Sequence, residues 1–158
     1  MGKSTVCGLL LAACCGVSAM ALAKHERTIV GAWTTTVTFV NCQTGDPVGV
    51  PAFPGLFTFH DGGTMSEYGV PPGSSPALRS PGHGVWQREE GWQDYAFTFM
   101  FRRYDATGAS IGSQRVEATL KLAANGDSFV TKSAVEILGP NNNVVATGCA
   151  STVGTRFD

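Results

Sequence analysis

Charged side chains are scarce in this sequence. Asp, Glu, Lys and Arg make up 15% of its 158 residues, and the formal net charge is −1. A typical soluble domain carries about 25% charged residues, and a nucleic-acid-binding domain usually presents a strongly basic surface. The length and composition therefore predict one globular domain that does not bind nucleic acid.

The sequence also lacks the motifs of metal, nucleotide and redox enzymes. It contains no His-Glu-x-x-His, no Cys-x-x-Cys, no Walker loop and no dinucleotide-binding glycine fingerprint. Segment 108–112 reads Gly-Ala-Ser-Ile-Gly and matches the nucleophile elbow. That motif needs a strand-turn-helix context, whereas this segment lies in a predicted hairpin turn. We therefore predict no catalytic residues, no metal site and no cofactor.

The N-terminus has the three parts of a secretory signal peptide. Lys3 supplies the positive charge, 6–17 form an apolar segment too short to span a bilayer, and Ala-Leu-Ala at 21–23 fits a cleavage site. These features predict a signal peptide over 1–23 and a single secreted or periplasmic domain over 24–158.

A second interpretation of the N-terminus is a lipoprotein signal. Leu-Ala-Ala-Cys at 11–14 resembles the lipobox of bacterial lipoproteins, in which the cysteine, here Cys14, is lipidated. The protein would then be held at the outer envelope, and this is the only way in which we expect it to contact a membrane. The residues after Cys14 stay apolar, which favours cleavage after Ala23.

Two of the five cysteines lie outside the predicted signal peptide, Cys42 and Cys149. A pair of cysteines in an exported domain predicts one disulfide. The alternative is two separate buried thiols.

Apolar and polar residues alternate in segments of strand length, separated by turn sequences rich in Gly, Pro, Asn and Asp. No connection is long enough for a crossover helix, so the strands are expected to be antiparallel. The segments predict an all-β fold, an eight-stranded antiparallel up-and-down barrel, with a two-sheet β-sandwich as the alternative. The expected strands are 31–42, 53–60, 64–68, 85–88, 92–104, 110–122, 128–138 and 144–157.

The register of the first and last strands follows if Cys42 lies opposite Cys149. Arg156 then lies opposite Thr35 and diagonal to Trp33, on the face away from the sulfurs. We expect the Arg156 cation to cover the Trp33 indole and to close one end of the barrel.

The same residues carry a resemblance to a known family. Gly31-Ala32-Trp33 near the start of the first strand, with Arg156 near the end of the last, resembles the lipocalins and other calycins. The resemblance implies a barrel in which Gly31, Trp33 and Arg156 are structural. The chain also resembles a group of uncharacterised exported bacterial proteins that share Arg-Ser-Pro-Gly-His-Gly-x-Trp, here 79–86, and Gly-Cys-Ala, here 148–150.

The candidate binding site combines a long loop with one aromatic strand face. The Pro-rich loop 69–82 is expected to border the open mouth, because long connections in a tight meander are often binding loops. The large inward side chains of strand 92–104 face small residues of the last strand, which are expected inward at Val144, Ala146, Gly148, Ala150, Thr152 and Gly154. The predicted ligand-binding residues are Arg79, His83, Trp86, Tyr95, Phe97, Phe99 and Phe101.

Each part of this site has an expected role. Arg79 would contact an anionic head group, Trp86 an apolar ring, and the aromatic strand the body of the ligand. The sequence leaves open whether the aromatic residues fill the barrel or line a cavity. Glu67, Glu117 and Glu136 are interpreted as members of a solvated ion-pair ladder on polar strand faces.

These features favour an exported protein that binds a small apolar molecule. A barrel enzyme is the first alternative, a cyclase or isomerase that would use Arg79, His83 or Tyr95 for proton transfer. A structural envelope protein with a filled barrel is the second. The oligomeric state does not follow from the sequence.

Overall fold

The computed structural model of the chain describes Gly2 and residues 28–157. Apart from Gly2, the predicted signal peptide 1–23 and the lipidation alternative at Cys14 lie outside the described residues. Within these residues, no helix is long and apolar enough to cross a membrane.

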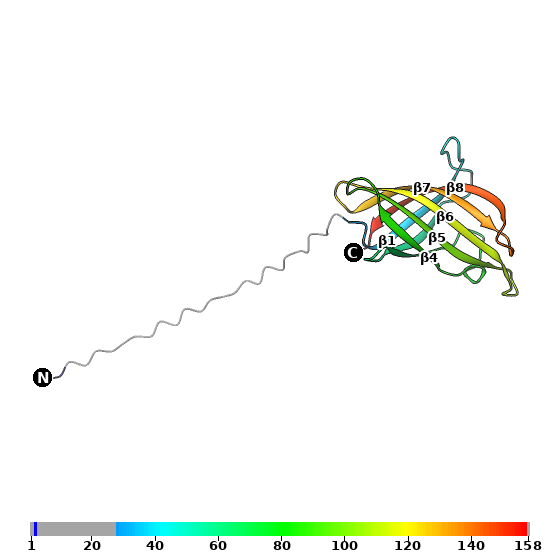
Figure 1. Ribbon diagram of the computed structural model, residues 1–158, viewed down its shortest axis with the longest axis horizontal. Helices are drawn as coiled ribbons and strands as arrows, with labels where there is room; N and C mark the ends of the chain where they lie inside the picture. The colour runs from blue at the N-terminus through cyan, green and yellow to red at the C-terminus, as the bar shows by residue number, and fades with distance from the viewer. Residues whose placement is uncertain (1, 3–27, 158) are drawn as a thin grey trace.

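The strands form one closed antiparallel barrel in which each strand pairs with the next and β1 pairs with β8 (Figure 1). The predicted all-β barrel is therefore confirmed, and the β-sandwich alternative is wrong. The strands are β1 Gly31–Val40, β2 Phe53–Phe59, β3 Thr64–Gly69, β4 Gly82–Arg88, β5 Asp94–Tyr104, β6 Ser110–Leu122, β7 Ser128–Leu138 and β8 Val144–Arg156.

Three strand boundaries differ from the sequence prediction by more than one residue. β1 ends at Val40, β5 begins at Asp94, and β4 begins at Gly82 rather than at residue 85. The first three residues of β4 were not predicted as strand because two of them are glycines, which have low strand propensity. Glycine at position 84 lets β4 pack closely against β5, since a Cβ there would overlap the backbone of β5. The shortened loop contains one turn of 3₁₀ helix, η1, over Pro76–Leu78.

One end of the barrel, called the closed end, is filled by aromatic side chains. Trp33 is 0% exposed and Tyr95 is 1% exposed. The Trp33 ring meets Phe129 edge-on, with ring centroids 4.9 Å apart. Trp86 meets Phe59 edge-on as well, with an interplanar angle of 89°. These contacts fill this end with part of the hydrophobic core.

Arg156 covers the Trp33 indole at 4.3 Å, as the sequence predicts. Its guanidinium donates hydrogen bonds to the backbone oxygens of Thr28, Val30 and Gly126. The Trp33 Nε1–H donates to the backbone oxygen of Ile29 at 2.9 Å. The arginine therefore ties both ends of the chain's barrel domain to the 123–127 turn.

The predicted register of β1 and β8 is wrong by two residues. Trp33 lies directly opposite Arg156, and Cys149 lies opposite Val40 rather than opposite Cys42. The prediction assumed that the disulfide joins directly opposed residues, but Cys42 lies beyond the end of β1 and reaches back to β8. A shift of two preserves which side chains face inward, so the interior assignment survives near Trp33.

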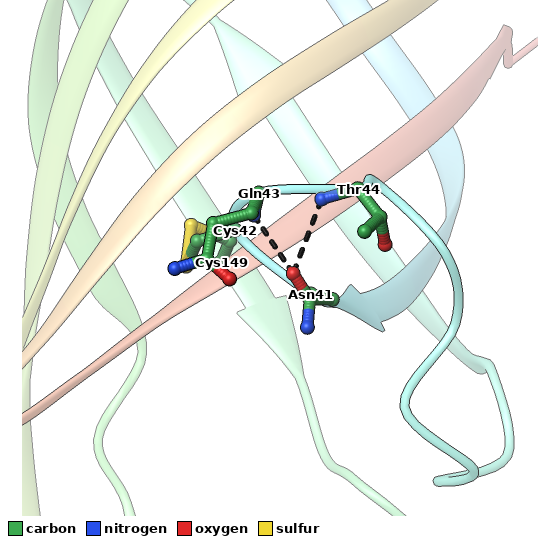
Figure 2. Close-up of a disulfide and its surroundings, with 5 residues drawn as sticks. All are labelled: Asn41, Cys42, Gln43, Thr44 and Cys149. Atoms are coloured by element: carbon green, nitrogen blue, oxygen red, sulfur yellow. Dashed lines mark hydrogen bonds between the residues drawn. A yellow bond between two sulfur atoms is a disulfide. The ribbon is translucent and has the colours of Figure 1, made fainter.

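Cys42 and Cys149 form the predicted disulfide, with their Cα atoms 5.2 Å apart. Figure 2 shows Asn41 beside it, whose side-chain oxygen accepts hydrogen bonds from the backbone N–H groups of Gln43 and Thr44 at 2.8 and 3.1 Å. The disulfide thus fixes the start of the exposed loop 41–52 to β8.

Trp33→Ala should reduce the free energy of unfolding by about 3–5 kcal/mol, because it leaves a cavity and removes the surface that Arg156 covers. The matched control is Leu56→Ala, since Leu56 lies on the outer face of β2 and is 56% exposed. Urea denaturation of both variants measures the difference. Equal losses of stability would contradict the assignment of inner and outer faces.

Replacing both disulfide cysteines by serine should destabilise the protein by about 2–4 kcal/mol, because the bond closes a long loop in the unfolded chain. The two cysteines are 107 residues apart in sequence. The measurement is the denaturation midpoint of oxidised, reduced and Cys42→Ser/Cys149→Ser protein. Identical midpoints in all three samples would show that the bond is absent in solution.

Candidate functional site

The opposite end of the barrel, called the open end, is less completely filled. Val37 and Phe39 face inward from β1, yet both are partly exposed, whereas Trp33 on the same face is completely buried. Solvent therefore reaches the interior from this end. The loop 70–81 crosses the rim here, since it joins the end of β3 to the start of β4. The predicted placement of this loop at the mouth is correct.

A cavity of about 90 Å³ lies inside the open end. Its wall is mainly aromatic and aliphatic, and its polar groups come from only a few side chains. The aromatic residues are Phe39, Phe53, Phe57, Phe97, Phe99 and Phe101; the polar and charged residues are Glu67, Arg79, Gln114, Ser133 and Thr152; and Val37, Pro71, Val116, Val135 and Ala150 complete the lining.

Arg79 and Glu67 form a buried ion pair in this wall. Their side chains are 9% and 6% exposed, and Arg79 Nη2 lies 2.5 Å from Glu67 Oε2. Arg79 Nη1 donates to Glu67 Oε1 at 3.3 Å and also to the backbone oxygen of Gly69. The guanidinium lies over the Phe101 ring at 3.6 Å. The arginine of the loop is thus held by charge, hydrogen bonds and an aromatic face together.

The interpretation of Glu67 as a solvated surface carboxylate is wrong. β3 alternates, with Met65, Glu67 and Gly69 buried and the residues between them less so. The inward position of Met65 was the sequence signal that Glu67 also faces inward. Burial raises the pKa of the Glu67 carboxyl, and the charge and hydrogen bonds of Arg79 lower it by less.

The loop 70–81 is attached to the barrel rim on the side of β5. The backbone N–H of Ser80 donates to the oxygen of Arg102, and the N–H of Arg102 donates to Ser80 Oγ at 2.9 Å. A second space of about 200 Å³ lies beneath the loop, with Pro71 and Arg79 shared between it and the inner cavity. Arg79 therefore stands between the interior and the underside of the loop.

Four of the predicted binding residues line the cavity: Arg79, Phe97, Phe99 and Phe101. His83 does not, because β4 begins at Gly82, which is buried, and alternation places the exposed His83 on the outer face. The prediction treated residues 82–84 as a flexible end of the loop. A strand there removes the freedom that would have aimed the imidazole at the mouth.

Trp86 and Tyr95 lie at the closed end, away from the cavity. Trp86 packs against Phe59 and Tyr95, and its indole N–H donates to the backbone oxygen of His60 at 3.0 Å. The Tyr95 hydroxyl donates to the backbone oxygen of Trp92. Their expected contacts with a ligand are replaced by contacts within the core.

The last strand also departs from the expected interior. Ala150, Thr152 and Gly154 are buried as expected, but Val144 and Ala146 are exposed. These two residues lie where β8 begins, and the pairing of β7 with β8 shifts register between Ile137 and Leu138. Here the strand extends past the filled part of the barrel, so an inward residue meets solvent.

The remaining carboxylates behave as the sequence predicts, as members of an ion-pair ladder on the outer face. Arg115 lies opposite Glu136 in the pairing of β6 with β7, and their side chains approach to 2.5 Å. Arg115 also lies 3.5 Å from Glu117. Both glutamates are thus structural groups of the surface.

Comparison with known proteins does not assign a function to this site. No protein-family model matches the chain, and no curated protein matches its sequence. Among the residues described by the structure, no group of three or more His, Cys, Asp or Glu side chains is gathered for a metal ion. The cavity and its ion pair therefore carry the functional argument.

The stability difference between the protein and Glu67→Gln should depend on pH. Folding raises the pKa of Glu67 above its ordinary 4.5, so the folded state holds this proton more tightly than the unfolded chain does. The contribution of Glu67 to stability is then greatest below that ordinary value and is lost as the pH rises through the folded pKa.

Glutamine does not titrate, so comparison with the Gln variant isolates the carboxyl group. Urea denaturation of both proteins, from about pH 4 to about pH 8, measures the effect. The advantage of the native protein over the variant should shrink as the pH increases. A constant difference, or one that grows with pH, would contradict the direction assigned to this pKa.

Proposed function

We propose that this protein is exported and binds a small, largely apolar molecule inside the open end of its barrel. The observation that carries the proposal is the aromatic cavity next to a buried ion pair, beneath a loop that crosses the mouth. Ligand sites are commonly apolar concavities with a few convergent polar groups, and the mouths of β-barrels are a frequent location. The resemblance to lipocalins at Gly31, Trp33 and Arg156 supports the same function.

The size of the cavity limits the ligand. A volume of about 90 Å³ lies well below the roughly 300–1,000 Å³ of drug-sized ligand sites, and below the 150 Å³ or so of an apolar cavity that holds benzene. A short branched chain fits a volume of this size, and a single ring enters when Val37 and Phe39 at the mouth move slightly outward. A longer molecule would extend into the space beneath the loop.

Export is supported by the disulfide, because such bonds persist mainly in oxidising compartments. It is also supported by the signal-peptide features over 1–23. Secretion or periplasmic location after cleavage at Ala23 is the proposed fate, with lipidation at Cys14 as the alternative that would hold the domain at a membrane.

An enzyme is the second candidate, favoured by one observation. Glu67 is a buried carboxyl with a raised pKa beside a cavity, and such groups often transfer protons in active sites. Of the three groups named from the sequence for this role, only Arg79 lines the cavity. A cyclase or isomerase would therefore use Glu67 as its acid or base.

Toluene tests the binding proposal, because it is apolar and has one ring. Titrated into ¹⁵N-labelled protein, it should shift the amide resonances of residues around Phe99 and Val135, which both line the cavity. Ala150→Leu should reduce binding at least about tenfold, because the added carbon atoms occupy the cavity.

The control for this experiment is Ala134→Leu, since Ala134 is exposed on the outer face of β7. It should bind toluene as the native protein does. An absence of shifts in the native protein, or equal binding by both variants, would contradict the proposal. Either result would instead favour a structural envelope protein whose barrel is filled.

A further inference from the structure

The polar groups of the cavity lie on two opposite walls. Glu67 comes from β3, while Ser133 comes from β7, which is four strands away in the closed barrel of eight. Thr152 of β8 lies diagonal to Ser133, whereas Gln114 of β6 lies opposite Phe101, the ring that the Arg79 guanidinium covers. Between the two walls the rest of the lining is mainly aromatic and aliphatic. A molecule in this space would therefore have a polar group at Glu67, an apolar body, and room for a weaker polar contact at the far side.

The guanidinium of Arg79 is already paired with neighbouring groups. Its Nη1 and Nη2 donate to the two oxygens of Glu67, and its Nε donates to the backbone oxygen of Ser80. Phe101 covers one face of the guanidinium. An anionic ligand would have to replace Glu67 as the partner or lie beside its negative charge, and no second cation from the described part of the chain lines the cavity.

Glu67, by contrast, has acceptor capacity left. A carboxylate can accept about four hydrogen bonds, and the hydrogen bonds of Glu67 in the described structure come from Arg79 alone. Burial disfavours its charge, so another donor in the cavity would be well placed to stabilise it. The open side of this carboxylate is the strongest polar attraction that the cavity offers to a small molecule.

We infer that the ligand is an uncharged molecule with a one-ring apolar body and a hydroxyl or N–H group that donates a hydrogen bond to Glu67. This inference rests on the proposed function and replaces the anionic head group expected from the sequence. Glu67 is then the residue that determines specificity, and Arg79 positions its carboxylate from the loop.

Three probes of similar size, phenol, toluene and benzoate, test the inference. At pH 7 phenol is uncharged and benzoate is an anion, because their ordinary pKa values are about 10 and about 4. Isothermal titration calorimetry of the native protein should give phenol a Kd about tenfold lower than that of toluene. Benzoate should bind at least about tenfold more weakly than phenol.

The variant Glu67→Leu/Arg79→Met should lose the preference for phenol and keep binding toluene. Both charges are removed together, so no unpaired ion is left in the core and folding is retained more readily than in a single variant. The matched control, Arg115→Met/Glu136→Leu, removes an ion pair from the outer face and should leave the preference unchanged.

The outcomes separate the two proposals. If benzoate binds most tightly, or if phenol is no better than toluene in the native protein, the inference about Glu67 is wrong while the binding function stands. If none of the three probes binds the native protein, the proposed function itself is wrong. The order of the three affinities in the native protein tests the inference even if the double variant does not fold.

Discussion

Pairing of β1 with β8 is the constraint on which the rest of this structure depends. It closes the sheet, leaves no free strand edge, and fixes which side chain of every strand faces inward. Arg156 reinforces the closure by bonding to residues on both sides of it and by covering Trp33. With one end filled in this way, the cavity lies toward the other end.

The two ends of the barrel differ because small and large side chains are distributed unevenly along it. At the closed end, the Phe129 ring occupies the space that a side chain at Gly154 would need, so a large side chain packs directly against a glycine. Near the open end, Gly82 leaves similar space beside Phe99, and the carboxylate of Glu67 lies there. A glycine beside a large side chain thus completes the core at the closed end, and a glycine near the open end leaves space for the carboxylate of Glu67.

Alternation in the sequence was enough to predict the barrel and its aromatic interior, because strand period is a local property. The contact of Trp33 with Arg156 was expected from the lipocalin resemblance and from a register that was wrong by two residues. Met65 also indicated which face of β3 points inward, but the prediction for Glu67 followed its charge instead of its position in the alternation. His83 was misplaced because the two glycines beside it give little strand signal. Trp86 was placed in a strand correctly, but its position toward the end of β4 puts it at the closed end of the barrel. The pairing of Glu67 with Arg79 depends on the path of the loop, which no local pattern specifies.

The buried ion pair adds little to stability, since the cost of removing two charges from water offsets most of their attraction. The ion pair instead fixes the position of the loop 70–81. Among the described residues Arg79 is the only cation lining the cavity, and its bonds to Glu67 and Gly69 bring the loop down onto β3. Movement of the loop away from the mouth would leave Glu67 buried without its partner, which is costly. The charge that lines the cavity therefore also holds the loop over its mouth.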